Sequence, residues 1–252
     1  MVRRYDGAVE DLARDARSAA RFRAMSTTPP LGVPLARPLP GLTVRPPGRV
    51  LLAAVVSLAV LWTAVRVGAA VARLVSLRAI ERWVVDGGGE PMVAVTTVDS
   101  WVPAAVEACL LVVLWACTSV WLARSRRVCD AMAPTTHSLS RRWAWWAWVT
   151  PVVCWWFPFR YVRDVLRAVG ERPRRLLAWW WVAWLVVVVV DTAGLWLVDE
   201  QPTVESLVLA ARLDLVAGLA LAVALVPWLV LVRRVASGTG RLAASRLAGP
   251  VR

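Results

Sequence analysis

The sequence predicts an all-α fold, an integral membrane helical bundle with four transmembrane helices and one tryptophan- and proline-rich element that is interfacial or re-entrant. Of the 252 residues, 59% are hydrophobic, and the mean hydropathy of +0.58 exceeds the usual range of soluble proteins. Four apolar stretches are each long enough to cross about 30 Å of hydrocarbon as a helix. All 30 basic residues are arginine, and most of them gather in segments outside these stretches.

The N-terminal segment, residues 1–48, is predicted to be a charged and proline-rich cytoplasmic arm that is largely disordered. In residues 1–26, arginine alternates with acidic residues among alanines, which fits either a short charged helix or disorder. Seven prolines fall in residues 29–47 and favour an extended polyproline II spacer.

A transmembrane domain is expected over residues 49–235, followed by a cytoplasmic tail over residues 236–252. The first span can continue past the membrane toward Val85, because Asp86 and three glycines after it would end a helix there. The four apolar stretches that we expect to span the membrane are residues 50–71, 102–122, 176–198 and 207–232.

A fifth apolar segment, residues 143–159, is short and is interrupted by Pro151 and Pro158. Eleven arginines flank it on its two sides, so a crossing would place one arginine cluster outside, against the positive-inside bias. We therefore expect the segment to enter the membrane and return, or to lie at the interface, where its tryptophan indoles are favoured. The residues assigned to this interfacial motif are Pro151, Trp155, Trp156, Pro158, Arg160, Arg163 and Asp164.

The distribution of charge predicts sidedness. The segments that we assign to the cytoplasm hold 25 arginines, whereas those assigned to the outside hold three arginines and seven acidic residues. This asymmetry predicts a multi-pass protein of the plasma membrane with both termini cytoplasmic. It also accounts for the net charge of +13 without nucleic acid. The expected partners are membrane lipids with anionic headgroups at the cytoplasmic face, and a protein partner is possible.

Five ionisable residues fall within the predicted spans, and all lie in the outer half of the membrane. An isolated charge near the centre costs roughly 2.5 to 3.5 kcal/mol, so we expect these side chains to neutralise one another. The pair expected first is Arg66 with Asp191. Such a cluster could serve an ion, proton or small-substrate pathway, or it could fix helix packing, or its side chains could snorkel to the outer interface. The predicted intramembrane polar cluster consists of Arg66, Glu107, Asp191, Arg212 and Asp214.

Signals for catalysis are weak. The four cysteines form no C-x-x-C pair, and His137 stands in a Ser/Thr-rich loop with no carboxylate partner evident from spacing. We expect no cofactor, no metal and no enzymatic activity. The predicted role is a membrane-embedded scaffold, sensor or partner-binding protein, and the alternative is a small transporter or channel-like protein that uses the outer-half charges. A solute path predicts a water-accessible cavity at these charges, whereas a scaffold predicts close pairing.

Several short stretches resemble domain-of-unknown-function family 4328. They are W-L-A-R-S-R-R at residues 121–127, W-x-T-P-V-V-C-W-W-F-P-F-R-Y-V-R-D at residues 148–164, and the later pair Trp179 and Trp180. The resemblance extends over residues 50–234. It implies a small bacterial membrane protein of a mainly actinobacterial family and no known activity. The chain departs from the family's usual asparagines at two positions, where it has Val128 and Cys154.

Overall fold

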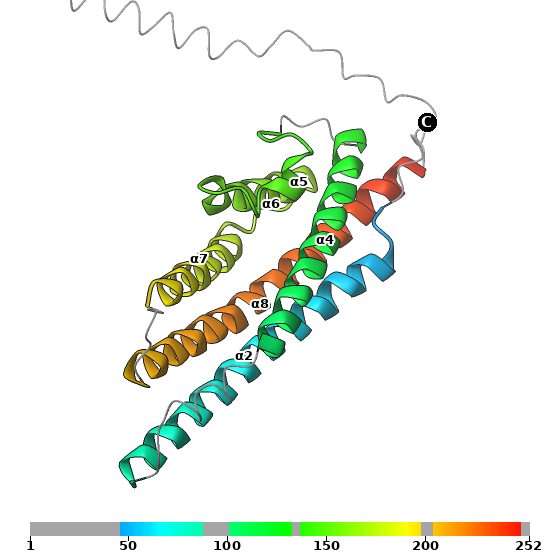
Figure 1. Cartoon of the computed structure of the whole chain (residues 1–252). Coiled ribbons are helices and arrows are strands. Elements are labelled where there is room, and N and C mark those ends of the chain that lie inside the picture. The colour runs from blue at the N-terminus through cyan, green and yellow to red at the C-terminus, as the bar shows by residue number, and fades with distance from the viewer. Residues whose placement is uncertain (1–45, 88–100, 133–136, 198–203, 248–252) are drawn as a thin grey trace, which may run out of the picture. The chain divides into compact units, whose positions relative to one another are not determined.

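The apolar stretches of the sequence form four long helices in a computed structural model of the chain (Figure 1). The structure describes residues 46–87, 101–132, 137–197 and 204–247, and none of these residues lies in a strand, so the all-α prediction is confirmed. The predicted arm, residues 1–48, falls almost entirely outside the described residues. The helices are α2 (Arg49–Val85), α4 (Trp101–Met132), α5 (Trp143–Trp146), the 3-10 helix η1 (Val153–Trp155), α6 (Phe157–Ala168), α7 (Arg174–Leu197) and α8 (Val204–Leu247).

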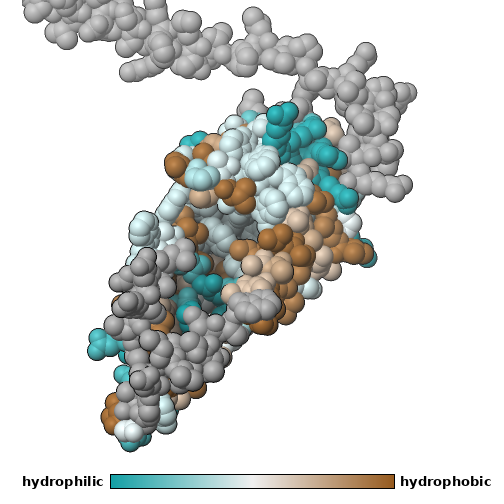
Figure 2. Space-filling model, in the orientation of Figure 1, coloured by the Kyte–Doolittle hydropathy of each residue, from teal (hydrophilic) through white to brown (hydrophobic). Residues whose placement is uncertain are grey.

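Four of these helices, α2, α4, α7 and α8, are long and apolar enough to cross a membrane. They contain 37, 32, 24 and 44 residues, and about 20 residues cross the hydrocarbon at 1.5 Å per residue. Their outward faces carry many exposed apolar side chains, such as Trp179, Val182 and Val226. In Figure 2, apolar residues coloured brown cover much of one side of the described surface. The chain is therefore a membrane-embedded protein with four candidate spans.

Two of the long helices extend well beyond the predicted apolar stretches. Helix α2 continues to Val85 and stops at the predicted turn, where Gly87 adopts a left-handed φ of 82°. Helix α8 continues to Leu247, so the predicted boundary between the transmembrane domain and the tail, at residues 235 and 236, falls inside a continuous helix.

Helix α8 is the helix against which the other spans pack. It contacts α7 and α2 most extensively and α4 less so, while α2 also packs on α4. Small residues allow this close approach: a Cβ added at Gly218 of α8 would lie 3.4 Å from a methyl of Val67 on α2. Because α7 packs mainly along α8, the space between α7 and the α2–α4 pair is bridged largely by side chains.

The predicted fifth segment forms a broken element and not a helix long enough to span. Helix α5 ends after one turn, and the chain passes through Val152, which has a left-handed φ of 67°, into η1. Helix α6 then starts with Pro158 in its first turn, where the missing N–H costs little. The break at the two prolines is therefore seen, and α5 and α6 both pack against α4.

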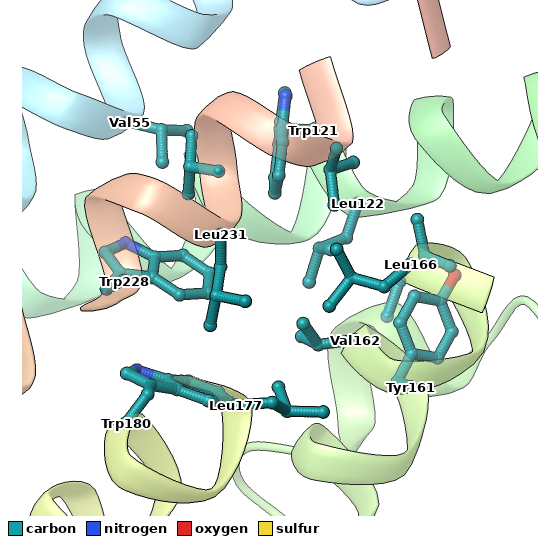
Figure 3. Packing of buried hydrophobic residues seen from close by; sticks show 14 of the residues in the cluster. Val55, Trp121, Leu122, Tyr161, Val162, Leu166, Leu177, Trp180, Trp228 and Leu231 are labelled. Carbon is teal, nitrogen blue, oxygen red and sulfur yellow. The ribbon is translucent and has the colours of Figure 1, made fainter. Parts of the chain in front are cut away.

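Helix α6 anchors this element in the main core. Apolar residues recur along α6 at helical spacing, and Tyr161, Val162 and Leu166 are each about 1% exposed. Figure 3 shows them beside Trp121 and Leu122 of α4, Leu177 and Trp180 of α7, and Trp228 and Leu231 of α8. The same core includes Val55 of α2, so it joins the broken element to all four long helices.

Candidate functional site

A single guanidinium lies at the centre of the charged cluster. Arg66 on α2 donates from Nη1 to Oε1 of Glu107 on α4 at 2.7 Å, and from Nη2 to Oδ1 of Asp191 on α7. The same Nη2 lies 3.7 Å from Oδ1 of Asp214 on α8. The structure therefore brings together four of the five predicted cluster residues, one from each long helix, and includes the expected contact between Arg66 and Asp191.

Arg73 is a cluster residue that the sequence prediction missed. Its Nη1 donates to Oδ2 of Asp214 at 2.9 Å. Seven residues separate Arg73 from Arg66, which is close to two helical turns and places both on one face of α2. The prediction counted Arg73 among the arginines outside the membrane, and the expected continuation of α2 toward Val85 brings it to the cluster.

Arg212 does not join the cluster, which corrects the prediction. It is exposed, and the ion pairs within the described residues do not include it. Arg212 and Asp214 are two residues apart on one helix, so their side chains point about 200° apart around its axis. Since Asp214 faces Arg66 and Arg73, Arg212 must face away.

The cluster combines three carboxylates with two guanidiniums, all partly buried. The exposed fraction of the side chains ranges from 18% for Glu107 to 38% for Asp191. Each lone charge would be costly in the membrane, and close pairing offsets that cost. The arrangement can therefore hold the four helices in one register.

An apolar cavity of about 220 Å³ lies next to the cluster along the helices. On α2, Trp62 and Thr63 of the cavity wall come one turn before Arg66, and on α4, Leu111 comes one turn after Glu107. Six tryptophans supply much of the wall. They are Trp62, Trp115, Trp148, Trp180, Trp184 and Trp228.

Contacts among the indoles fix most of this wall. The rings of Trp62 and Trp184 lie 6.3 Å apart, and those of Trp180 and Trp228 stack at 5.2 Å. Trp115 donates from Nε1 to the carbonyl oxygen of Trp145 at 3.2 Å, and so ties α4 to the end of α5. The Nε1 of Trp62, by contrast, is buried without a hydrogen-bond partner in the described structure.

The predicted interfacial motif is only partly gathered in space. Trp155 and Trp156 are about 40% exposed, and Arg160 is exposed, so these three present an outward face. Pro158 and Asp164 are buried instead. The remaining members are Pro151, which is exposed, and Arg163, which is half-buried.

Asp164 has a structural role that the sequence did not reveal. Its Oδ2 accepts hydrogen bonds from the backbone N–H of Ser138 at 3.0 Å and from the Ser138 hydroxyl at 2.5 Å. Arg163 lies 3.7 Å from the other carboxylate oxygen. Asp164 thus pins the loop after α4 to helix α6.

His137 has a carboxylate partner, which corrects the expectation that it stands alone. Its Nε2 lies 3.3 Å from Oδ1 of Asp130 on α4, and Asp130 also accepts hydrogen bonds from Arg126 at 2.8 Å and Arg141 at 2.7 Å. Burial and the Arg126 guanidinium lower the pKa of His137 below its ordinary value. Arg126 and Asp130 are four residues apart on α4, and this spacing indicates an ion pair between them. The sequence has no comparable signal for the contact of His137 with Asp130.

Burial also acts on Tyr161, whose ring lies under Arg126 with the guanidinium carbon 5.8 Å from the ring centroid. Desolvation of the hydroxyl raises the pKa of Tyr161 well above its ordinary value.

Within the described residues, no group of three His, Cys, Asp or Glu side chains is placed to hold a metal ion. The arrangement therefore offers paired charges and an apolar cavity as its chemical features.

Comparison with known proteins assigns a family. A family model described as Domain of unknown function (DUF4328) matches residues 92–237, which is more than half of the chain. The match includes Glu107, Asp191 and Asp214 but begins after α2, so it is shorter at its start than the expected resemblance over residues 50–234. No curated protein and no solved structure matches the chain. The chain belongs to the DUF4328 family of domains of unknown function.

Proposed function

We propose that this protein is a membrane-embedded sensor or scaffold that binds the apolar chain of a lipid in its tryptophan-lined cavity. The proposal places it in the plasma membrane with both termini in the cytoplasm, and it assigns no enzymatic activity. The observation that carries it is the cavity of about 220 Å³ among the four long helices and the turn that follows α5.

The cavity's chemistry favours an acyl or prenyl chain. Its wall is almost wholly apolar, and the indole rings offer broad surfaces for dispersion contacts. An apolar cavity of about 150 Å³ in another protein stays dry and binds benzene, so a space of this size can hold part of a hydrocarbon chain. Because the cavity lies within membrane-spanning helices, lipid chains are the most abundant molecules that can reach it.

The geometry of the charges supports a binding role over the alternative of a transporter. A path for a polar solute would need a water-accessible cavity at Arg66, Asp191 and Asp214. These side chains pair closely, and the tryptophan-lined cavity beside them has an apolar wall without any of the three. A polar solute leaving the cluster along the bundle would meet this apolar layer, where its desolvation is costly.

Photo-crosslinking with a long-chain fatty acid that carries a diazirine near its methyl end tests the proposal. The full chain in nanodiscs is irradiated, and the modified residues are mapped by mass spectrometry. We expect adducts at cavity residues such as Leu114 and Trp184, above the background at lipid-facing residues such as Val182. Adducts confined to the lipid-facing surface would refute the proposal.

A pair of alanines on α2 provides the matched variants. Ala59 is 4% exposed and lines the cavity, whereas Ala64 is exposed on the same helix. Ala59→Leu fills the cavity and should remove the cavity adducts while the protein stays folded. Ala64→Leu adds the same volume at the surface and should leave them unchanged.

A further inference from the structure

We propose that a second cavity, between α6 and the start of α7, binds a phosphate-bearing anion through its arginines. This inference does not depend on the apolar cavity. The space measures about 710 Å³, and its charged lining comprises Arg163, Arg167, Arg172 and Arg174 with the carboxylates Asp164 and Glu171.

The two carboxylates in this cavity are already engaged. Asp164 is 6% exposed and accepts two hydrogen bonds from Ser138. Glu171 pairs with two arginines of α8, at 3.4 Å from Arg234 and 3.2 Å from Arg241. Among the arginines that line the cavity, Asp164 pairs with Arg163 at 3.7 Å, and neither acid forms an ion pair with Arg167, Arg172 or Arg174.

The arginines of the cavity have unused hydrogen-bonding capacity. Among the described residues, Arg167, Arg172 and Arg174 form no ion pair with a carboxylate, and all three are exposed. Arg163 contacts Asp164 only at 3.7 Å, and its buried Nε has no hydrogen-bond partner. Four guanidiniums thus line one space with two carboxylates, of which Asp164 pairs only with Arg163 and Glu171 pairs with arginines of α8.

The turn between the helices brings these arginines together. Helix α6 ends at Ala168, and Gly170 adopts a left-handed φ of 83° that other residues rarely adopt. The Gly170 N–H then donates to the carbonyl of Arg167 at 3.0 Å, and the Glu171 N–H donates to that of Leu166 at 2.9 Å. This turn brings arginines from the end of α6 and the start of α7 to the wall of the same cavity.

The ligand class follows from the donor set. Guanidinium groups bind phosphate oxygens through paired N–H donors, and several arginines can surround one phosphate. Helix α7 begins at Arg174, so the positive end of its dipole lies beside this residue of the cavity wall. Both an anionic lipid headgroup and a free phosphate have this chemistry, and the experiment below separates them.

Native mass spectrometry of the full chain in a neutral detergent tests the site. The protein is titrated separately with short-chain phosphatidylglycerol, phosphatidylcholine and inorganic phosphate. Two double variants remove the same charge from the same two helices. Arg167→Gln with Arg174→Gln changes the cavity, whereas Arg160→Gln with Arg175→Gln changes exposed arginines that do not line it.

We expect phosphatidylglycerol to bind the parent chain in preference to phosphatidylcholine. The cavity variant should weaken this binding about tenfold or more, and the surface variant should change it little. Binding of inorganic phosphate with the same variant dependence and no preference for phosphatidylglycerol supports the site and identifies a soluble ligand. Equal weakening by both variants, or no anion binding, would overturn the proposal. Neither cavity arginine lines the tryptophan cavity, so the fatty-acid crosslinks report on the other proposal separately.

Discussion

At the scale of single residues, Arg66 matters most to the charge balance of the bundle. Glu107 and Asp191 each form an ion pair with Arg66 alone among the described residues, whereas Asp214 also has Arg73. Replacing Arg66 with Met therefore leaves two carboxylates unpaired. We expect a loss of about 3 kcal/mol in the free energy of unfolding, at the low end for a broken buried pair, measured by denaturant titration in detergent.

Arg212 is the matched control for this prediction. It is also an arginine within a predicted span, but it is exposed and outside the cluster. Arg212→Met should change stability by no more than about 0.5 kcal/mol. Adding Glu107→Gln and Asp191→Asn to the Arg66→Met variant should recover part of the loss, because neutral amides do not need the missing guanidinium. Equal effects of the two arginine variants would contradict the assigned role.

His137 makes the stability of the described fold depend on pH. Burial and Arg126 hold its pKa below the ordinary value of 6.5, so the unfolded chain takes up the proton at a higher pH than the folded chain. The unfolded state then binds more protons as the pH falls below 6.5, and stability decreases by at most about 1.4 kcal/mol per pH unit.

The measurement is thermal unfolding of the parent chain and of His137→Gln from about pH 8 to about pH 5. His137 is the one histidine in the sequence, so the variant should show a flatter profile through this range. Parallel profiles for the two proteins would show that other groups cause the pH dependence.

At the scale of elements, the turn after α6 is held against α8 by a glycine. A Cβ added at Gly238 would lie 2.5 Å from Cβ of Val169 and 2.7 Å from one of its methyls, which is too close without movement. We expect Gly238→Ala to destabilise the protein by about 1–3 kcal/mol through overpacking. Differential scanning fluorimetry of the purified chain measures the change.

Gly240, two residues along the same helix, serves as the control. A Cβ there would meet nothing within 4 Å, so Gly240→Ala should be neutral or should stabilise α8 by up to about 1 kcal/mol through helix propensity. Destabilisation by both substitutions would indicate that helix flexibility, and not the contact with Val169, explains the glycine.

Much of the element pattern follows from local sequence. Hydrophobic runs predict the four spans because a helix that crosses hydrocarbon must be apolar along its length. The prolines at 151 and 158 predict the break after α5. The contact of Arg66 with Asp191 was also predictable, since both lie about fifteen residues into spans that run in the same direction.

Other features depend on how the helices and loops pack against one another. Arg73 reaches Asp214 only because α2 stays helical beyond its apolar run, and His137 reaches Asp130 only because the loop folds back on α4. The tryptophan cavity depends on α7 packing mainly along α8, which a sequence pattern does not reveal. The composition of the charged cluster and the shape of the tryptophan cavity therefore depend on contacts between elements that are distant in the sequence.

At the scale of the whole bundle, three features follow one another along the long helices. On α7, the basic cavity involves Arg174 and Leu177, the tryptophan cavity involves Trp180 and Trp184, and the charged cluster involves Asp191. A rise of 1.5 Å per residue places Asp191 about 25 Å from Arg174 along the axis. The two proposed binding sites are therefore neighbours, and the charged cluster lies beyond both.

The side of the membrane on which each loop lies can be tested in the intact protein. Four candidate spans in the described residues would place both ends of the membrane domain on one side, and from the positive-inside bias we expect that side to be the cytoplasm. In a variant with its four cysteines replaced by serine, single cysteines are introduced by Thr96→Cys, Ser140→Cys, Arg175→Cys or Ser245→Cys. Intact cells are then treated with a membrane-impermeant maleimide.

We expect labelling of intact cells only for Thr96→Cys, which lies between the first two spans. Ser140→Cys and Arg175→Cys flank the broken element, and both should react only after the cells are permeabilised, as should Ser245→Cys. If Ser140→Cys and Arg175→Cys label from opposite sides, the element crosses the membrane. The tryptophan cavity and the arginine cavity would then need a different placement in the bilayer, and a cytoplasmic anionic headgroup could no longer be the ligand of the second.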